Sequence, residues 1–202
     1  MIPARFGDGR RRRIGLLGGS FNPAHAGHIH VARQSMRALG LDQVWLMVSP
    51  GNPLKPRAGM APLPARLAGA RRLADGRRVI ATDIERVLGT RFTADTLAKL
   101  RRRFPRAAFV FLIGADNLVQ LPRWKSWQRI AASTPLAVLP RPGWTRQALH
   151  GAAASVLRRQ RCRPGALLAG AKRATRQAKW CFVSAREHAA SATAIRAAAL
   201  HP

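Results

Sequence analysis

Short apolar runs alternate with amphipathic stretches along the whole chain, and this alternation constrains the fold more than any other feature. The apolar runs cover residues 13–17, 44–48, 79–82, 108–113, 135–139 and 180–183. The amphipathic stretches place apolar residues at helical spacing over residues 28–39, 63–74, 93–103 and 193–200. Strands that alternate with helices form βαβ units, so we predict an α/β fold with a parallel sheet flanked by helices on both faces. Such sheets bind ligands in the loops that follow the carboxyl ends of their strands.

The charge balance is strongly basic, because 36 Lys and Arg residues face only 8 Asp and Glu, giving a formal net charge of +28. A balance of this kind favours polyanionic partners such as nucleotides, nucleic acid or an anionic surface. Arg in particular binds phosphate through paired hydrogen bonds. Charge alone does not distinguish among these partners.

Other features of the sequence limit the class and location of the protein. No apolar run approaches the ~20 residues that span a bilayer, and no signal peptide is visible, so we expect a cytoplasmic protein with no membrane partner. Cys162 and Cys181 lack a CxxC neighbour and a histidine at metal-ligand spacing, so we expect no metal site in the protein. The length suits one domain over residues 13–202, after a flexible basic arm over residues 1–12.

The loop after the first predicted strand is the richest in chemistry. Residues 18–28 read GGSFNPAHAGH and lead into a helix. Glycines let the backbone approach a ligand closely, and the helix start offers unpaired N–H groups to a phosphate. The imidazoles of His25 and His28 can donate hydrogen bonds to oxygens that gain charge in a transition state. A histidine at a helix start is also a common cap, so the pair alone does not prove catalysis.

The run resembles the GGxFxPxHxGH signature of the nucleotidyltransferase superfamily, and it matches at every signature position. The resemblance implies a Rossmann-like three-layer nucleotidyltransferase fold whose first loop binds the phosphates of ATP. It implies catalytic roles for His25 and His28. It also implies ATP contacts from Gly18, Gly19, Ser20, Phe21, His25, Gly27 and His28.

Two further segments resemble motifs of the bacterial nicotinate-nucleotide adenylyltransferases within that superfamily. Residues 48–56 resemble their PxxNPxK region, which implies that Asn52 and Lys55 border the mononucleotide, together with Ser20 of the first loop. Residues 91–97 resemble their S/R-Y-T-x-D-T-L motif, in which the threonine faces the pyridine carboxylate. We therefore expect Thr93 to cap a helix and bind the mononucleotide, although Phe92 replaces the usual tyrosine.

The strand over 108–113 leads into a third motif. Residues 113–127 resemble the IGxDxLxxLxxWxxW block of the same family, which discriminates it best from the pantetheine-phosphate enzymes. Gly114 allows close approach of a ligand, and Asp116 can accept hydrogen bonds from ribose hydroxyls, so both are predicted ATP contacts. Trp124 can stack on the pyridine ring, whereas we expect Trp127 to belong to the core.

The last motif lies near the end of the chain. Residues 191–196 resemble the family's ISSTxIR motif, again with hydroxyls at a helix start and an arginine one turn later. That arrangement suits the terminal phosphates of ATP. It implies that Ser191, Thr193, Ile195 and Arg196 bind ATP and that Arg196 also acts in catalysis.

The resemblance implies adenylyl transfer from ATP to nicotinate mononucleotide in NAD biosynthesis, with Mg²⁺ carried on the ATP phosphates. The acid is favoured over the amide because the local field is positive. The alternatives are a nucleotidyltransferase with nicotinamide mononucleotide or pantetheine phosphate as acceptor, and a basic nucleic-acid-binding protein. No motif for specific nucleic-acid recognition is present. The oligomeric state stays open, a homo-oligomer included.

Overall fold

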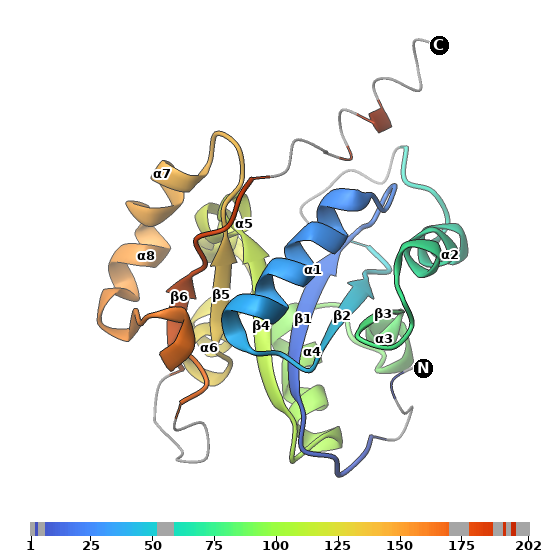
Figure 1. Ribbon diagram of the computed structural model, residues 1–202, viewed down its shortest axis with the longest axis horizontal. Helices are drawn as coiled ribbons and strands as arrows, with labels where there is room; N and C mark the ends of the chain where they lie inside the picture. Colours follow the sequence, from blue (N-terminus) through green and yellow to red (C-terminus); the bar gives the residue numbers. More distant parts are fainter. Residues whose placement is uncertain are drawn as a thin grey trace.

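A computed structural model of the chain describes residue 3 and residues 7–51, 59–169, 178–187, 192, 195 and 196. Six parallel strands form one sheet in the order β3-β2-β1-β4-β5-β6 (Figure 1). The strands are β1 (Arg13–Gly19), β2 (Gln43–Val48), β3 (Val79–Thr82), β4 (Ala108–Gly114), β5 (Leu136–Leu139) and β6 (Trp180–Phe182). The predicted parallel α/β sheet is therefore confirmed.

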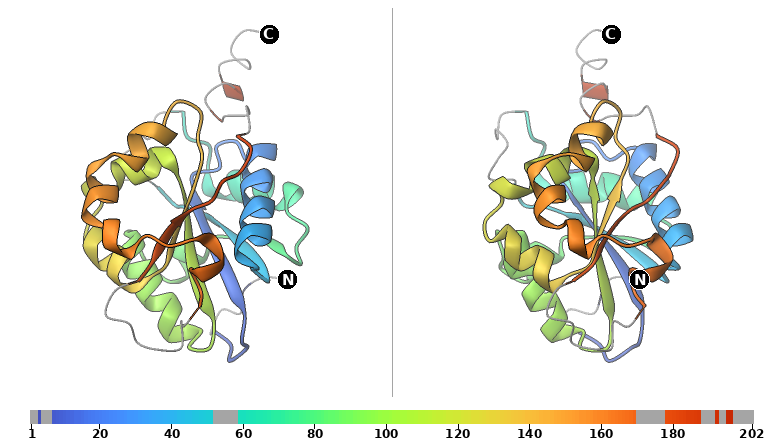
Figure 2. Two further views of the ribbon diagram at one scale, coloured as in Figure 1. Left: turned by 60° about the vertical axis from the view of Figure 1, so that its left-hand side comes forward. Right: turned by 90° about the vertical axis from the view of Figure 1, so that its left-hand side faces the viewer.

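Alternate residues of the strands face two separate apolar layers, as expected of a sheet covered on both sides. One layer packs against α1 (Ala26–Leu39) and α2 (Leu63–Leu73), and it includes Leu46 and Val110. The opposite layer, with Leu16 and Phe111, is covered by α3 (Ile84–Val87), α4 (Thr93–Arg103), α5 (Ala115–Gln120), α6 (Trp127–Ser133), α7 (Thr145–Leu149) and α8 (Ala152–Val156). Both views of Figure 2 show the sheet between α1 and the helices of the opposite layer, which completes the three layers.

Short 3₁₀ turns link several of these elements: η1 (Leu121–Arg123), η2 (Arg158–Gln160) and η3 (Pro164–Ala166). The stretch 145–179, in which the sequence shows no motif, forms α7, α8, η2 and η3 before β6. The predicted helix over 193–200 lies largely outside the described residues. In the part of the chain that the structure describes, no helix is long and apolar enough to cross a membrane.

One predicted cap is wrong. Thr93 was expected to cap the helix that it begins, but it is the first helical residue of α4, and Phe92 occupies the cap position in extended conformation without a side-chain hydrogen bond. The reason is local geometry, because a cap residue must stand outside the helix for its side chain to reach the next N–H groups. Thr93 instead presents its side chain from the first turn.

The central pair of strands sets the position of the site. β1 pairs with β2 on one side and with β4 on the other. The chain crosses from β1 to α1 on one face and from β4 to α5 on the opposite face. At such a switch point the loops after the two strands diverge and leave a crevice at the carboxyl edge.

Candidate active site

A cavity of about 430 Å³ opens at this edge, at the carboxyl ends of β1, β2 and β4. It brings together six of the predicted site residues: Gly18, Gly19, Ser20, Thr93, Gly114 and Trp124. His25, His28, Asp116 and Arg196 do not line it. The site therefore has two parts, which are this cavity and a surface around the start of α1.

The side chains of His25 and His28 form a capping box at the start of α1. The backbone N–H of Gly27 donates to His25 Nδ1 at 3.2 Å, and the backbone N–H of His25 donates to His28 Nδ1 at 3.1 Å. Since each Nδ1 accepts a hydrogen bond, the proton of each neutral ring is on Nε2. Both imidazoles therefore carry their N–H on Nε2, and they stand at a helix start that already favours anions.

The His28 ring is held in place by its neighbours. Its centroid lies 3.9 Å from that of His25 and 4.6 Å from that of Phe21. Burial, and then the nearby His25, lower the pKa of His28 to about 3, and Arg141 acts in the same direction. His28 is therefore neutral at physiological pH in the free protein, and it acts as a hydrogen-bond donor without carrying a charge.

Arg141 is a residue that the sequence motifs did not indicate. It follows β5 and lines a narrow crevice of about 20 Å³ beside α1, together with Gly27 and His30. A cation at this position adds to the positive potential around the start of α1. Only its place after a strand could have singled it out among the many arginines.

The first loop also contacts the end of the chain. The Arg196 guanidinium donates to the backbone oxygen of Asn22, and Asn22 uses its side-chain amide to bind Gly59 O at 2.9 Å and the Ala61 N–H at 3.2 Å. Arg196 is thus placed beside the histidine loop, whereas Ile195 is exposed. Ser191 and Thr193, the other predicted residues of this motif, lie outside the described residues.

A buried arginine joins the loops after β1 and β2. Arg66 of α2 is only 4% exposed, and its guanidinium donates to Ser20 O at 2.7 Å, Ser49 O at 2.8 Å and Ala61 O at 2.8 Å. A weaker bond reaches Pro50 O at 3.4 Å. Burial lowers the pKa of this guanidinium. Sequence reasoning missed Arg66, although an arginine on the apolar face of a helical stretch is a usable signal.

The opposite wall of the cavity carries cations and aromatic rings. Lys125 Nζ lies 4.3 Å from the centroid of the Phe92 ring, and the Arg91 guanidinium carbon lies 5.8 Å from the same centroid. Trp124 packs edge-on against Phe111, with centroids 6.1 Å apart. Trp127 packs against the core, as predicted. Asn52 and Lys55, the other residues predicted for the acceptor side, lie outside the described residues.

Gly114 and Asp116 are related differently from what the sequence suggested. A Cβ on Gly114 would lie 2.4 Å from Asp116 Oδ1, so the glycine leaves room for the Asp116 carboxylate at the strand end. Asn117, which the sequence did not single out, lines the cavity in place of Asp116 and donates to Asp116 Oδ1 at 3.5 Å.

Glu85 of α3 is the remaining residue that sequence reasoning missed. It is half-buried, it lines the cavity, and its carboxyl accepts a hydrogen bond from Thr96 Oγ1 at 3.4 Å. Burial raises its pKa to about 7, although hydrogen bonds from Ser49 and Thr96 favour the ionised form. It is one of only two glutamates in the chain. Among the described residues, no group of three or more His, Cys, Asp or Glu side chains is arranged to hold a metal ion.

The sequence matches known proteins over nearly its whole length. Residues 16–198 match the family model described as cytidylyltransferase-like. A probable nicotinate-nucleotide adenylyltransferase of Gluconobacter oxydans (strain 621H) is 61% identical over 186 residues, which cover 91% of this chain and 93% of that protein. Another of Gluconacetobacter diazotrophicus (strain ATCC 49037) is 55% identical over 199 residues, 98% of this chain and 91% of that protein.

Solved structures support the fold. The Plasmodium falciparum nicotinic acid mononucleotide adenylyltransferase complexed with NaAD superposes with a TM-score of 0.65 at 14% identity, over 92% of this chain and 83% of that chain. The same protein complexed with APC gives a TM-score of 0.63, with the same identity and coverage. On the strength of the bacterial relatives, which match more than half of its residues over almost its full length, the chain belongs to the nicotinate-nucleotide adenylyltransferase family.

Proposed function

We propose that the protein transfers the adenylyl group of ATP to nicotinate mononucleotide, giving nicotinate adenine dinucleotide and pyrophosphate in NAD biosynthesis. The observation that carries this function is the position of the histidine-capped start of α1 next to a cavity at the switch point of the sheet. One part suits a triphosphate, and the other suits a flat, charged mononucleotide. The names of the bacterial relatives agree with this reaction.

In this reaction a phosphate oxygen of the mononucleotide attacks the α-phosphorus of ATP in line. The new P–O bond forms as the bond to the β-phosphate oxygen breaks, and pyrophosphate leaves with that oxygen. No residue becomes covalently attached, so the protein acts by positioning two anions and by stabilising charge on the bridging and terminal oxygens. The Nε2–H groups of His25 and His28 and the guanidinium of Arg196 are the donors for that charge.

The acceptor is the acid rather than the amide. Within the part of the chain that the structure describes, three cationic side chains line the cavity, namely Arg91, Arg123 and Lys125. Thr93, at the start of α4, adds the positive end of a helix. A pyridine carboxylate gains from both, whereas a neutral carboxamide gains little.

Mg²⁺ would enter with ATP. Arg196 offers a cation and the first loop offers N–H donors, but neither offers a carboxylate, which fits an ion held by phosphate oxygens and water rather than by a protein cage. Bound there, the ion neutralises part of the triphosphate charge. The cytoplasmic location and the oligomeric state stay predictions.

The test is a pyrophosphate-release assay with the purified protein and Mg²⁺-ATP, run in parallel with nicotinate mononucleotide, nicotinamide mononucleotide and pantetheine phosphate. We expect turnover with the first and a kcat/KM at least ten times lower with the amide. Equal turnover of acid and amide would overturn the acceptor assignment, and release only with pantetheine phosphate would overturn the function.

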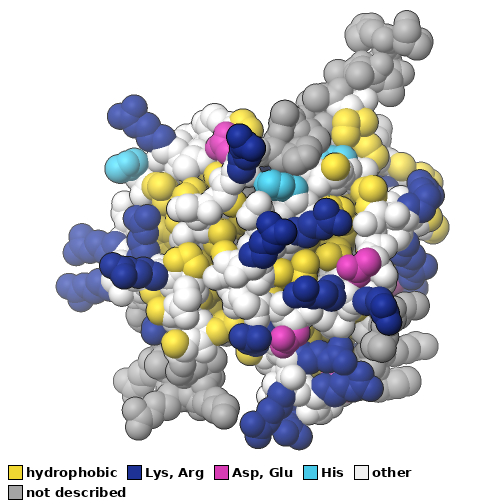
Figure 3. All heavy atoms as spheres, in the orientation of Figure 1, with side chains coloured by type: hydrophobic (Ala, Val, Ile, Leu, Met, Phe, Trp, Pro, Cys, Tyr) yellow, Lys and Arg dark blue, Asp and Glu magenta, His cyan; other side chains and the backbone are white. Residues whose placement is uncertain are grey.

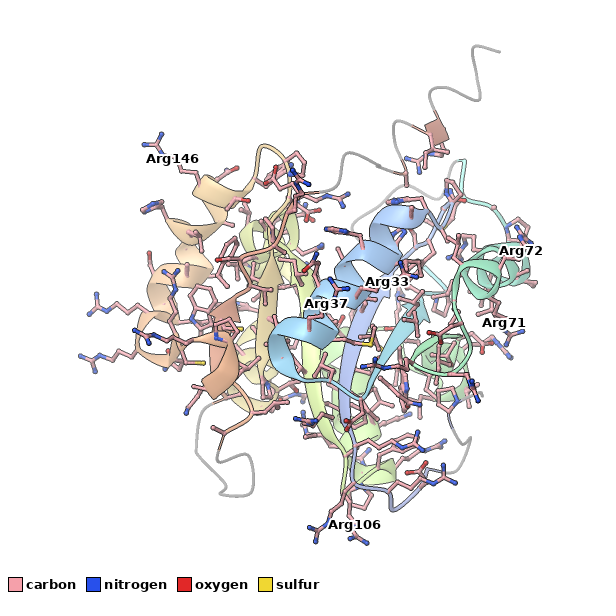
Figure 4. All side chains as sticks on the ribbon, in the orientation of Figure 1. Arg33, Arg37, Arg71, Arg72, Arg106 and Arg146 are labelled. Atoms are coloured by element: carbon pink, nitrogen blue, oxygen red, sulfur yellow. The ribbon has the colours of Figure 1, made fainter. Side chains whose placement is uncertain are left out.

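The high net charge is the one observation that favours nucleic-acid binding. Figure 3 shows Lys and Arg side chains spread over the visible face rather than gathered in one stripe, and the labelled arginines of Figure 4 lie on several different elements. A dispersed charge predicts weak, salt-sensitive and non-specific binding. Filter binding to DNA and RNA in ~0.15 M salt, a physiological ionic strength, measures this binding. Tight, sequence-selective retention of a nucleic acid would favour a nucleic-acid-binding function instead.

A further inference from the structure

The cavity carries one carboxyl group among its cations. Of the described residues that line it, Glu85 is the only acidic one, against Arg91, Arg123 and Lys125. If phosphate and carboxylate recognition were the only requirement, a glutamate here would weaken binding through its own charge. A positive group on the ligand would offset this cost.

The hydroxyl groups around Glu85 allow its carboxyl to be either ionised or protonated. Thr96 Oγ1 lies 3.4 Å from Glu85 Oε1, but also 3.3 Å from Phe92 O. Ser49 donates to the carboxylate of Glu85, yet its Oγ also lies 2.9 Å from Gly51 O. Because each hydroxyl has a second acceptor, the protein accommodates both charge states without leaving a donor unpaired.

Several charged side chains on the surrounding elements are paired with other groups. On α3 and just before it, Arg86 pairs with Asp83 at 2.7 Å. On α4, Asp95 pairs with Arg129 at 2.7 Å, and Lys99 Nζ donates to Leu88 O at 2.7 Å. β2, which packs against α3, contributes no charged side chain. Arg91, Arg123 and Lys125 face the same cavity, but burial and the two hydroxyls, not these cations, account for the pKa shift of Glu85.

We propose that Glu85 is a specificity-determining residue that binds the positively charged pyridinium ring of the acceptor, so that the cavity selects the oxidised pyridinium nucleotide over an uncharged ring. The inference rests on the proposed function. The base of the acceptor is a zwitterion, with a cationic ring nitrogen and an anionic carboxylate. The cavity has the complementary charges, which are one carboxyl on its wall and the cations around Phe92. The 1,4-dihydropyridine form of the same mononucleotide keeps the carboxylate and the phosphate but loses the ring charge.

The first experiment compares these two acceptors at pH 8 in the wild type, in Glu85→Gln, and in the control Glu187→Gln, whose residue is exposed and lies outside the cavity. Gln keeps the shape and hydrogen-bonding capacity of the side chain and removes its charge. We expect E85Q to lower kcat/KM for the pyridinium acceptor about tenfold, the effect of one pK unit of interaction, and to change the dihydropyridine value less than twofold. Equal losses with both acceptors, the result of a purely structural role, would overturn the proposal.

The second experiment uses the wild type alone, so it does not depend on the folding of a variant. Calorimetric titration at pH 7 in two buffers of different ionisation enthalpy counts the protons exchanged on binding. We expect the pyridinium nucleotide to release more protons than its dihydropyridine form, because only the charged ring favours ionised Glu85. Identical proton counts would overturn the proposal. If the wild type instead showed no turnover of any pyridine acceptor in the pyrophosphate-release assay, the proposed function itself would be wrong.

Discussion

The backbone N–H of His25 donates to Nδ1 of His28, while the His25 ring accepts the N–H of Gly27, so the two histidines that cap α1 are fixed in the same tautomer. Each ring is thereby committed to an Nε2–H donor before any ligand arrives. Such preorganisation is what makes a donor effective toward charge that develops in a transition state.

Replacement of His28 by Ala removes one of these donors. We expect kcat to fall by about 10²–10³-fold, the usual effect of losing one transition-state donor. Because the pKa of His28 is lowered to about 3, the ratio of wild-type to H28A kcat/KM for ATP should stay constant between pH 5.5 and 8. His150→Ala, at the exposed end of α7, is the control. A ratio that collapses as the pH falls through 6.5 would show that His28 titrates there.

Arg196 is exposed, and its guanidinium donates to Asn22 O of the first loop. We expect Arg196→Met to lower kcat by about 10–100-fold, since a guanidinium that meets phosphate contributes strongly only when the ligand is bound, and to leave the melting temperature unchanged. The matched control is Arg146→Met on α7, where the arginine side chain points outward in Figure 4. It should change neither kcat nor the melting temperature. A fall in melting temperature without a fall in kcat would assign Arg196 a structural role.

Arg66 donates to the carbonyls of Ser20, Ser49 and Ala61 and, more weakly, to that of Pro50. We expect Arg66→Met to lower the free energy of unfolding by about 2–4 kcal/mol, because it strands buried acceptors, and to raise the KM for both substrates. Urea denaturation and steady-state kinetics measure the two effects. Arg71→Met, on the exposed side of the same helix, should change neither. Unaltered KM values in Arg66→Met would show that this arginine does not position the loops of the site.

Gly114→Ala tests the role of Asp116 without removing the carboxylate. The new Cβ would occupy the space of Asp116 Oδ1, the tip of a flexible side chain, so we expect displacement of that carboxylate with little loss of stability. The KM for ATP should rise about 3–10-fold, the worth of one hydrogen bond. Asp116→Ala should give the same rise, and the double variant no more, because both remove one contact. Fully additive effects would show that the two residues act separately.

Glu85 also makes stability depend on pH. Its pKa is about 7 in the folded protein against 4.5 when unperturbed, so between these values the unfolded chain loses the proton that the folded chain keeps. Stability therefore falls as pH rises through that window and levels off above 7. We expect Glu85→Gln to melt higher than the wild type at pH 8 and at the same temperature near pH 4. A difference that is independent of pH would contradict the assigned pKa.

Much of the fold followed from local patterns. The strands were predicted because buried parallel strands are continuous apolar runs, and the loop at 18–28 because its glycines and histidines stand between a strand and a helix. Trp124 and Thr93 were assigned to the site by motif, and both line the cavity. The placement of these residues is observed, whereas their roles stay predictions until the variants are measured.

The rest depended on contacts between distant residues. Arg66 meets Ser20 across 46 positions of sequence, and no local pattern records such a pairing. Burial raises the pKa of Glu85, and the hydroxyls of Ser49 after β2 and Thr96 of α4 act against it. Only the folded sheet brings these groups together. The Thr93 cap failed for a smaller reason, a shift of one residue in where the helix begins.

Among the described residues, every hydrogen-bond acceptor of the Arg66 side chain is a main-chain oxygen. Every amino acid supplies the same carbonyl, so substitutions at positions 20, 50 and 61 can alter substrate choice and still leave Arg66 its acceptors. Ser49 is different, because its hydroxyl also bonds Gly51 O. Insertions or deletions in those loops are a different matter, because they move the carbonyls themselves. Variants designed to change the substrate specificity of this enzyme should therefore alter the amino acids of these loops and keep the loop lengths.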